Sequence, residues 1–125
     1  MSQEREVLAV VPKRLDLVIK RGVDFPIVFT LTNGEAVAVD ITGDAILFRV
    51  YDRPGGTLLF QVAGAITTAA SGITTVTIAD TDTAIAAFST TDSSLAWYDL
   101  LRTEDASGDK GVYFEGDLVI HPIAA

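Results

Sequence analysis

The chain has 125 residues, a formal net charge of −8 at pH 7 and an isoelectric point near 4.3. This length suits one domain with one hydrophobic core, and the absence of cysteine excludes disulfide-stapled scaffolds and thiolate metal sites. The acidic charge argues against nucleic acid and membrane surfaces as partners, because proteins bind both largely through Lys and Arg.

The N-terminal segment, residues 1–14, is interpreted as an arm outside the domain, which then spans residues 15–125. Its apolar run, residues 7–11, ends at Pro12 and is too short for a secretion signal or a membrane span. We therefore expect a soluble chain without a cleaved leader. The apolar side chains of the arm are candidate contacts with another protein: Val7, Leu8, Val10 and Val11.

The first third of the domain predicts strands separated by turns. Apolar side chains alternate along residues 15–20 and 25–31, which is typical of strands with one buried face. The dipeptide Asn33-Gly34 is a strong hairpin signal. We therefore expect residues 36–40 to pair back with the preceding strand.

The middle of the chain predicts three more strands and one helical segment. Residues 44–51 and 57–62 read as strands, and residues 53–56 between them form a turn that contains one proline and two glycines. Residues 73–78 are rich in β-branched side chains, which favour strands. Residues 80–88 have the capping and apolar spacing of one or two helical turns.

Two long strands, residues 94–103 and 111–120, end the chain around a polar loop. Roughly seven to nine strands with frequent turns and almost no helix predict an antiparallel β-sandwich or barrel. The sequence thus indicates an all-β fold with one short helical turn.

Candidate catalytic groups are few. His121 is the one histidine, and we interpret it as a surface residue at a strand end because no nucleophile motif accompanies it. The other candidates are two pairs of acids, Asp80 with Asp82 and Asp105 with Asp109. Both pairs lie in predicted turns, where carboxylates bond backbone amides, and the calcium-loop pattern is absent. We predict no catalytic residue, no metal site, no cofactor and no enzymatic activity.

Aromatic residues on the last two strands raise another possibility. Trp97, Tyr98 and Tyr113 would suit stacking on a sugar ring if their rings were open to solvent. Aromatic pairs across a terminal hairpin more often pack in the core and at the sheet edge, and this is the interpretation that we favour. All three are kept as candidate contact residues.

Five motifs, taken in order, resemble small structural proteins of tailed bacteriophages. Residues 16–31 resemble their opening strand-Gly-Asp-strand unit, and residues 39–43 (VDITG) resemble their V-D-L-T-G turn. Residues 72–83 resemble a strand followed by a D-T helical turn, and residues 97–100 (WYDL) resemble a Y-x-Y-D-L strand. Residues 108–120 are similar to the closing G-x-x-x-I hairpin.

The resemblance implies an immunoglobulin-like β-sandwich that is assembled into a virion, in the tail, the baseplate or the fibre attachment region. It implies synthesis in the host cytoplasm, and partners that are other virion proteins and further copies of the chain, with no small-molecule substrate. We expect the arm to dock on a neighbour, as an added strand or as a short helix. The alternative is a carbohydrate- or receptor-binding module that uses exposed aromatic rings.

Overall fold

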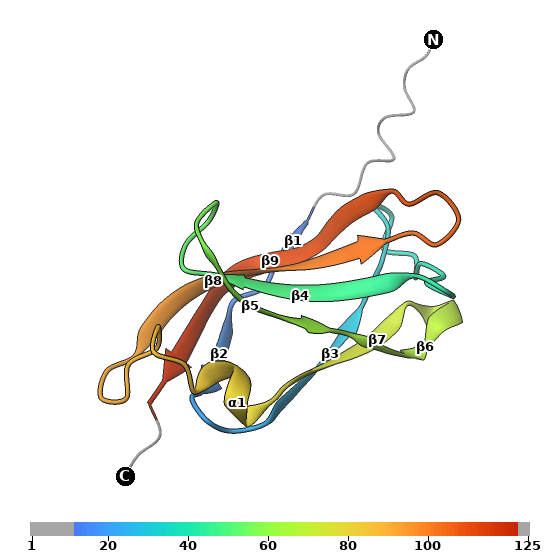
Figure 1. Ribbon diagram of the computed structural model, residues 1–125. Coiled ribbons are helices and arrows are strands. Elements are labelled where there is room, and N and C mark those ends of the chain that lie inside the picture. The colour runs from blue at the N-terminus through green and yellow to red at the C-terminus, as the bar shows by residue number, and fades with distance from the viewer. Residues whose placement is uncertain (1–11, 123–125) are drawn as a thin grey trace.

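Two β-sheets pack face to face in the computed structural model, which describes residues 12–122 (Figure 1). The larger sheet contains six strands: β1 (Lys13–Arg14), β2 (Leu17–Lys20), β4 (Ala45–Tyr51), β5 (Leu58–Ala63), β8 (Ser94–Thr103) and β9 (Lys110–His121). The smaller sheet contains three: β3 (Phe25–Thr30), β6 (Ala65–Thr68) and β7 (Ile73–Ile78). Two short helical elements complete the fold: the 3-10 turn η2 (Ala69–Ser71) and α1 (Asp80–Thr83).

The strand order confirms the predicted all-β sandwich with one short helical turn, with one difference in the larger sheet. Its order is β1-β9-β8-β4-β5, and β2 also pairs with β9. β1 and β2 run parallel to β9, so the sheet is mixed. The turn at residues 21–24 carries the chain from β2 into the smaller sheet, so β2 and β3 do not pair with each other. The partner of β2 is β9, at the far end of the chain. Lys13 and Arg14, which the sequence places in the arm, belong to the sheet as β1.

Side chains from both sheets fill the space between them. Alternate residues of β4 are buried, as the pattern of residues 44–51 predicts. Phe48 of β4 stacks on Tyr98 of β8, with ring centroids 5.0 Å apart. Phe29 of β3 lies 5.0 Å from Phe114 of β9, and this pair joins the two sheets. Full burial contributes about 1.5–3 kcal/mol for each side chain of this size.

A β-bulge interrupts β9 beside the core. Leu100 faces Phe114, but the next residue, Leu101, faces Val112, so Tyr113 is the extra residue on β9. A bulge breaks the two-residue alternation of a strand. Tyr113 and Phe114 are consecutive, yet both are buried.

The turn at residues 39–43 forms as predicted. The backbone N–H of Thr42 donates to Oδ1 of Asp40 over 3.0 Å, and the Thr42 hydroxyl donates to the same oxygen over 2.6 Å. Gly43 adopts a φ of +79°, a conformation that glycine reaches without a steric cost.

The loop at Asn33 differs from the predicted hairpin. Asn33 Oδ1 accepts the backbone N–H groups of Glu35 and Val37, so its side chain organises a wider loop. The positive φ falls at Ala36 and not at Gly34. The returning segment still pairs back over a short stretch, as expected: the Asn33 N–H donates to the Val37 carbonyl over 2.8 Å and the Val39 N–H donates to the Leu31 carbonyl over 2.9 Å, around a bridge between residues 32 and 38.

The predicted helical segment at residues 80–88 forms one turn, α1. The Asp82 carboxylate accepts the N–H of Ala79 over 2.8 Å and satisfies a donor at the start of the helix. Residues 84–88 are not helical. Phe88 is nevertheless buried, and its ring packs edge-on against Phe60 of β5.

Candidate interaction surface

The outer face of the larger sheet, meaning the side chains that point away from the smaller sheet, carries ordered rows of residues. Val18 of β2, Val119 of β9 and Leu95 of β8 form the apolar row, because Val119 is the direct cross-strand partner of the other two. Their chain neighbours point into the core, as the two-residue period of a strand requires. Val18 and Leu95 are 57% and 66% exposed, so the apolar row faces solvent.

An aromatic row lies beside the apolar row, two residues further along each strand. Trp97 of β8 stands between Tyr51 of β4 and Asp117 of β9. The guanidinium of Arg14 lies 5.0 Å from the centroid of the Trp97 ring, and its Nη2 lies 3.1 Å from Oδ2 of Asp117. Such a cation–π contact contributes about 0.5–1 kcal/mol at an exposed site, and here it orients both groups on the outer face.

An ion pair forms the third row. Arg49 of β4 and Asp99 of β8 are cross-strand partners, and Arg49 donates two hydrogen bonds of 2.7 Å, one to each carboxylate oxygen. Both side chains are largely buried, although they belong to the outer face. The bidentate geometry holds the two charges in a fixed orientation, so the row presents a neutralised pair and not a free charge.

These three rows suit contact with another protein. Burial of the surface that Val18 and Leu95 still expose would contribute about 1–2 kcal/mol each. The strands already hold the backbone in place, so binding orders little beyond side chains. Trp and Arg are residue types that commonly carry the binding energy of interfaces, and Trp97 with Arg14 stands at the centre of the face.

The structure separates the predicted aromatic contact residues. Trp97 lies on the outer face, but Tyr98 is fully buried, because neighbouring residues of a strand point to opposite faces. The Tyr98 hydroxyl donates to the carbonyl of Leu15 over 2.5 Å, and burial raises the pKa of the Tyr98 phenol well above its ordinary value. Tyr98 therefore packs in the core, as the favoured interpretation of these aromatic residues predicts, and its place among the candidate contact residues is wrong.

Tyr113 also faces the interior of the sandwich. The β-bulge turns its ring inward, and its hydroxyl accepts a hydrogen bond of 3.0 Å from Nη1 of Arg102. Tyr113 is therefore not part of the outer face, although it borders a hollow described below. The four arm residues predicted as contacts lie outside the described residues: Val7, Leu8, Val10 and Val11.

Sequence reasoning missed the apolar row. Residues 17–19 are all apolar, so Val18 occupies a position that a strand with one buried face leaves polar. That signal was present in the sequence. The sequence did not show that Val18 and Leu95 belong to one row, because their alignment depends on the pairing of β2 and β8 with opposite edges of β9.

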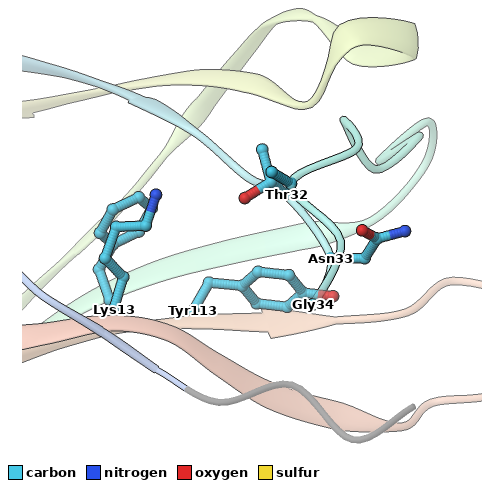
Figure 2. A pocket seen from close by; sticks show the side chains of 7 residues that line it. Lys13, Thr32, Asn33, Gly34 and Tyr113 are labelled. Atoms are coloured by element: carbon cyan, nitrogen blue, oxygen red, sulfur yellow. The ribbon is translucent and has the colours of Figure 1, made fainter.

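A hollow of about 360 Å³ opens between the two sheets, and Figure 2 shows it from close by. Lys13 of β1 and Tyr113 of β9 lie on one side, and Thr32 and Asn33 of the loop after β3 lie opposite. The Lys13 ammonium is 5.8 Å from the ring centroid of Phe114. The remaining lining residues are Gly34, Ala36 and Phe114.

A second, polar hollow is lined in part by Arg102, and the guanidinium of Arg102 is bound by other groups of the protein. Arg102 Nε donates to Oδ2 of Asp44 over 2.6 Å, and Nη2 donates to the carbonyl of Asp40 over 3.3 Å. With the bond to Tyr113, every arm of the guanidinium is engaged. The cluster ties the residue 39–43 turn to β8 and has a structural role.

The pair closest to a catalytic arrangement is Ser93 with His121. Ser93 Oγ lies 2.6 Å from His121 Nδ1, and both residues are exposed at the end of β9. No carboxylate within residues 12–122 hydrogen-bonds to His121, so the third member of a triad is missing from this part of the chain. The same residues contain no group of three or more His, Asp or Glu that could hold a metal ion.

No protein-family model matches the chain, and no curated protein matches it. In the described part of the chain, no helix has the length and apolar character needed to cross a membrane.

Proposed function

We propose that this protein is a structural module of a bacteriophage virion, in the tail, the baseplate or the fibre attachment region. In this proposal the chain is made in the host cytoplasm and binds other virion proteins and further copies of itself. The observation that carries the proposal is the outer face, where the apolar row and the aromatic row stand side by side on a rigid sheet. The five ordered motifs supply the link to the phage proteins.

A structural role also accounts for three well-defined polar contacts of the described chain. Arg102 and Asp44 bind each other within a hydrogen-bond network, Arg49 and Asp99 form a fixed pair, and His121 anchors the loop at Ser93. Each group is used to connect strands or loops. This supports the proposal that the protein is not an enzyme.

The carbohydrate-binding alternative has less support. Stacking on a sugar needs a platform of exposed rings, but Tyr98 and Tyr113 face the core. Of the three candidate rings Trp97 alone lies on the outer face, beside Tyr51, and the Arg14 guanidinium already lies over the Trp97 ring. No observation on the described residues favours this function over assembly.

The outer face is tested with Leu95→Glu, a change that places a charge in the apolar row. We expect the purified chain to self-associate with rising concentration in light scattering coupled to size exclusion, and the variant to remain monomeric. The matched control is Val28→Glu, because Val28 of β3 is 65% exposed on the other sheet. If both variants associate equally, the outer face is not the binding surface.

The virion assignment is tested separately. In a lysate of the host that carries the gene, the chain should band with intact phage particles in a density gradient and remain with them after a wash in high salt. Recovery only in the soluble fraction would contradict the virion proposal, whatever the oligomeric state of the purified protein.

A further inference from the structure

A second apolar row lies on the outer face, at the opposite end from the first. Leu101 of β8 is the cross-strand partner of both Leu47 of β4 and Val112 of β9. These side chains point outward, because the neighbouring Phe48 and Leu100 are buried in the core. All members of the second apolar row keep part of their surface exposed. The aromatic row and the ion pair therefore stand between two apolar rows.

The outer face is neutral, although the chain carries a net charge of −8. The strand registers place four basic and four acidic side chains on it: Arg14, Lys20, Arg49 and Lys110 with Asp16, Asp99, Glu115 and Asp117. The rest of residues 12–122 holds eleven acidic side chains and four basic ones. Two copies of a strongly acidic chain repel each other, and a neutral face lets them meet without that repulsion.

The size of the outer face suits a dimer. Five strands lie side by side, and β4, β8 and β9 have 7, 10 and 12 residues. A strand spacing of about 4.8 Å and a rise of about 3.3 Å per residue give the face an area of roughly 700 Å². Stable interfaces bury roughly 600–1,000 Å² on each partner. The smaller sheet has three short strands and offers only about 250 Å² by the same measure.

One two-fold axis matches the order of the rows. β8 is the central strand of the larger sheet, and its outward side chains run from Leu95 through Trp97 and Asp99 to Leu101 (Figure 1). An axis that lies in the contact plane and crosses β8 between Trp97 and Asp99, at right angles to the strand, exchanges the two apolar rows. Under this symmetry Leu95 faces Leu101 of the partner subunit. Stacked sheets keep their strands within about 30° of each other, so residues near the centre stay opposite one another.

We propose that two copies of the chain bind through their outer faces about this axis, so that the apolar row of each packs on the second apolar row of the other. The inference rests on the proposed assembly function and names the partner and the contact. Arg49 and Asp99 already bind each other through two hydrogen bonds, so the contact covers them without leaving an unpaired charge. A two-fold contact closes on itself, and this surface therefore makes dimers and no longer assemblies.

Charge complementation tests which rows meet. Leu95→Lys places an ammonium in the apolar row, and Leu101→Glu places a carboxylate in the second apolar row. Each variant alone should elute as a single chain of 13.3 kDa in light scattering coupled to size exclusion, because its charge meets an apolar side chain. In an equal mixture the new ammonium faces the new carboxylate, and the other contact keeps both leucines. The mixture should recover twice that mass, with a dissociation constant at least roughly tenfold below that of either variant alone.

The matched control is a mixture of Leu95→Lys with Leu95→Glu, which carries the same two charges at positions that do not face each other. It should stay monomeric. Cysteine trapping gives a second measurement that does not depend on the folding of Leu101→Glu, since the chain has no cysteine of its own. In an oxidised mixture of Leu95→Cys and Leu101→Cys, links between positions 95 and 101 should exceed links between identical positions by more than roughly tenfold. Random collisions would give only a twofold excess.

Every other outcome overturns the inference. A dimer restored by the control mixture, or cysteine links mainly between identical positions, would show a different arrangement of the copies. Masses that grow beyond two copies would show a contact that does not close. A parent chain that stays monomeric but bands with phage particles would show that another virion protein covers the outer face, and the virion function would stand. A dimer that is absent from the particles would contradict the virion function alone.

Discussion

Replacement of Tyr98 by phenylalanine isolates one hydrogen bond between the N-terminal strands and the centre of the larger sheet. The Tyr98 ring is fully buried and stacked on Phe48, and phenylalanine keeps that packing. What disappears is the hydroxyl that donates to the Leu15 carbonyl over 2.5 Å. That bond ties the connection between β1 and β2 to β8, across the intervening β9.

The expected loss of unfolding free energy is about 1–2 kcal/mol. A typical net hydrogen bond contributes about 0.5–1.5 kcal/mol, and a buried acceptor left without a donor costs about 1–3 kcal/mol. Leu15 is 40% exposed, so water reaches its surroundings and the value falls in the lower part of that range. Tyr98→Ala removes the ring as well and should cost about 3–5 kcal/mol.

Urea unfolding followed by tryptophan fluorescence measures the effect, since the chain has a single tryptophan, Trp97, beside the mutated position. Tyr51→Phe on the outer face is the control and should stay within about 0.5 kcal/mol of the parent. A loss for Tyr98→Phe below about 0.5 kcal/mol, or equal to that of Tyr98→Ala, would refute the assignment of the hydrogen bond.

We also expect the parent and Tyr98→Phe to differ in how their stability depends on alkaline pH. Burial raises the pKa of Tyr98 in the folded chain above its ordinary value of 10.0. The stability that comes from burying the neutral phenol is fully present below pH 10.0, and it is lost as the pH rises through the pKa of Tyr98 in the folded chain. The parent should therefore lose stability more steeply above pH 10 than Tyr98→Phe, which has no such group to ionise. Parallel curves would contradict this account.

Three further predictions follow from individual contacts. Gly116→Ala should lower the free energy of unfolding by about 1–3 kcal/mol, because the new Cβ would strike the backbone carbonyl that precedes β2. Gly111→Ala is the control: its Cβ has room, so the free energy of unfolding in urea should change by less than about 0.5 kcal/mol. Equal effects of the two changes would show that the strand relaxes around the larger residue. A double-mutant cycle on Arg49 and Asp99 should give a coupling of about 0.5–2 kcal/mol that changes little with salt, because the pair is largely buried; additive changes would show that the pair contributes nothing. The pKa of Asp16 is lowered, first by a backbone N–H of β9 and then by the adjacent arginine, so its stabilising effect is present above the ordinary value of 3.8 and is lost as the pH falls below it. The gap in thermal midpoint between the parent and Asp16→Asn should narrow below that pH, and a constant gap would be inconsistent with the shift.

Features that depend on neighbouring residues were predictable from the sequence. The alternation of residues 44–51 gave a strand with one buried face, and the β-branched run at residues 73–78 gave another, because the two-residue period acts within each strand. The turn at Asp40 and Gly43 and the single helical turn at residues 80–88 also follow local rules, since their hydrogen bonds join residues a few positions apart. Local chemistry thus determined the class of fold and most of its strands.

Pairing between distant segments was decided by the tertiary structure alone. β2 lies parallel to β9, about a hundred positions away in the chain, and this pairing brings Val18 beside Val119 and completes the apolar row. The bulge at Tyr113 exists only relative to β8, and it turns inward a ring that regular alternation would place outside. Sequence periodicity specifies which face of a strand is apolar, but the choice of partner and register depends on long-range packing, and the outer face and the hollow are products of that choice.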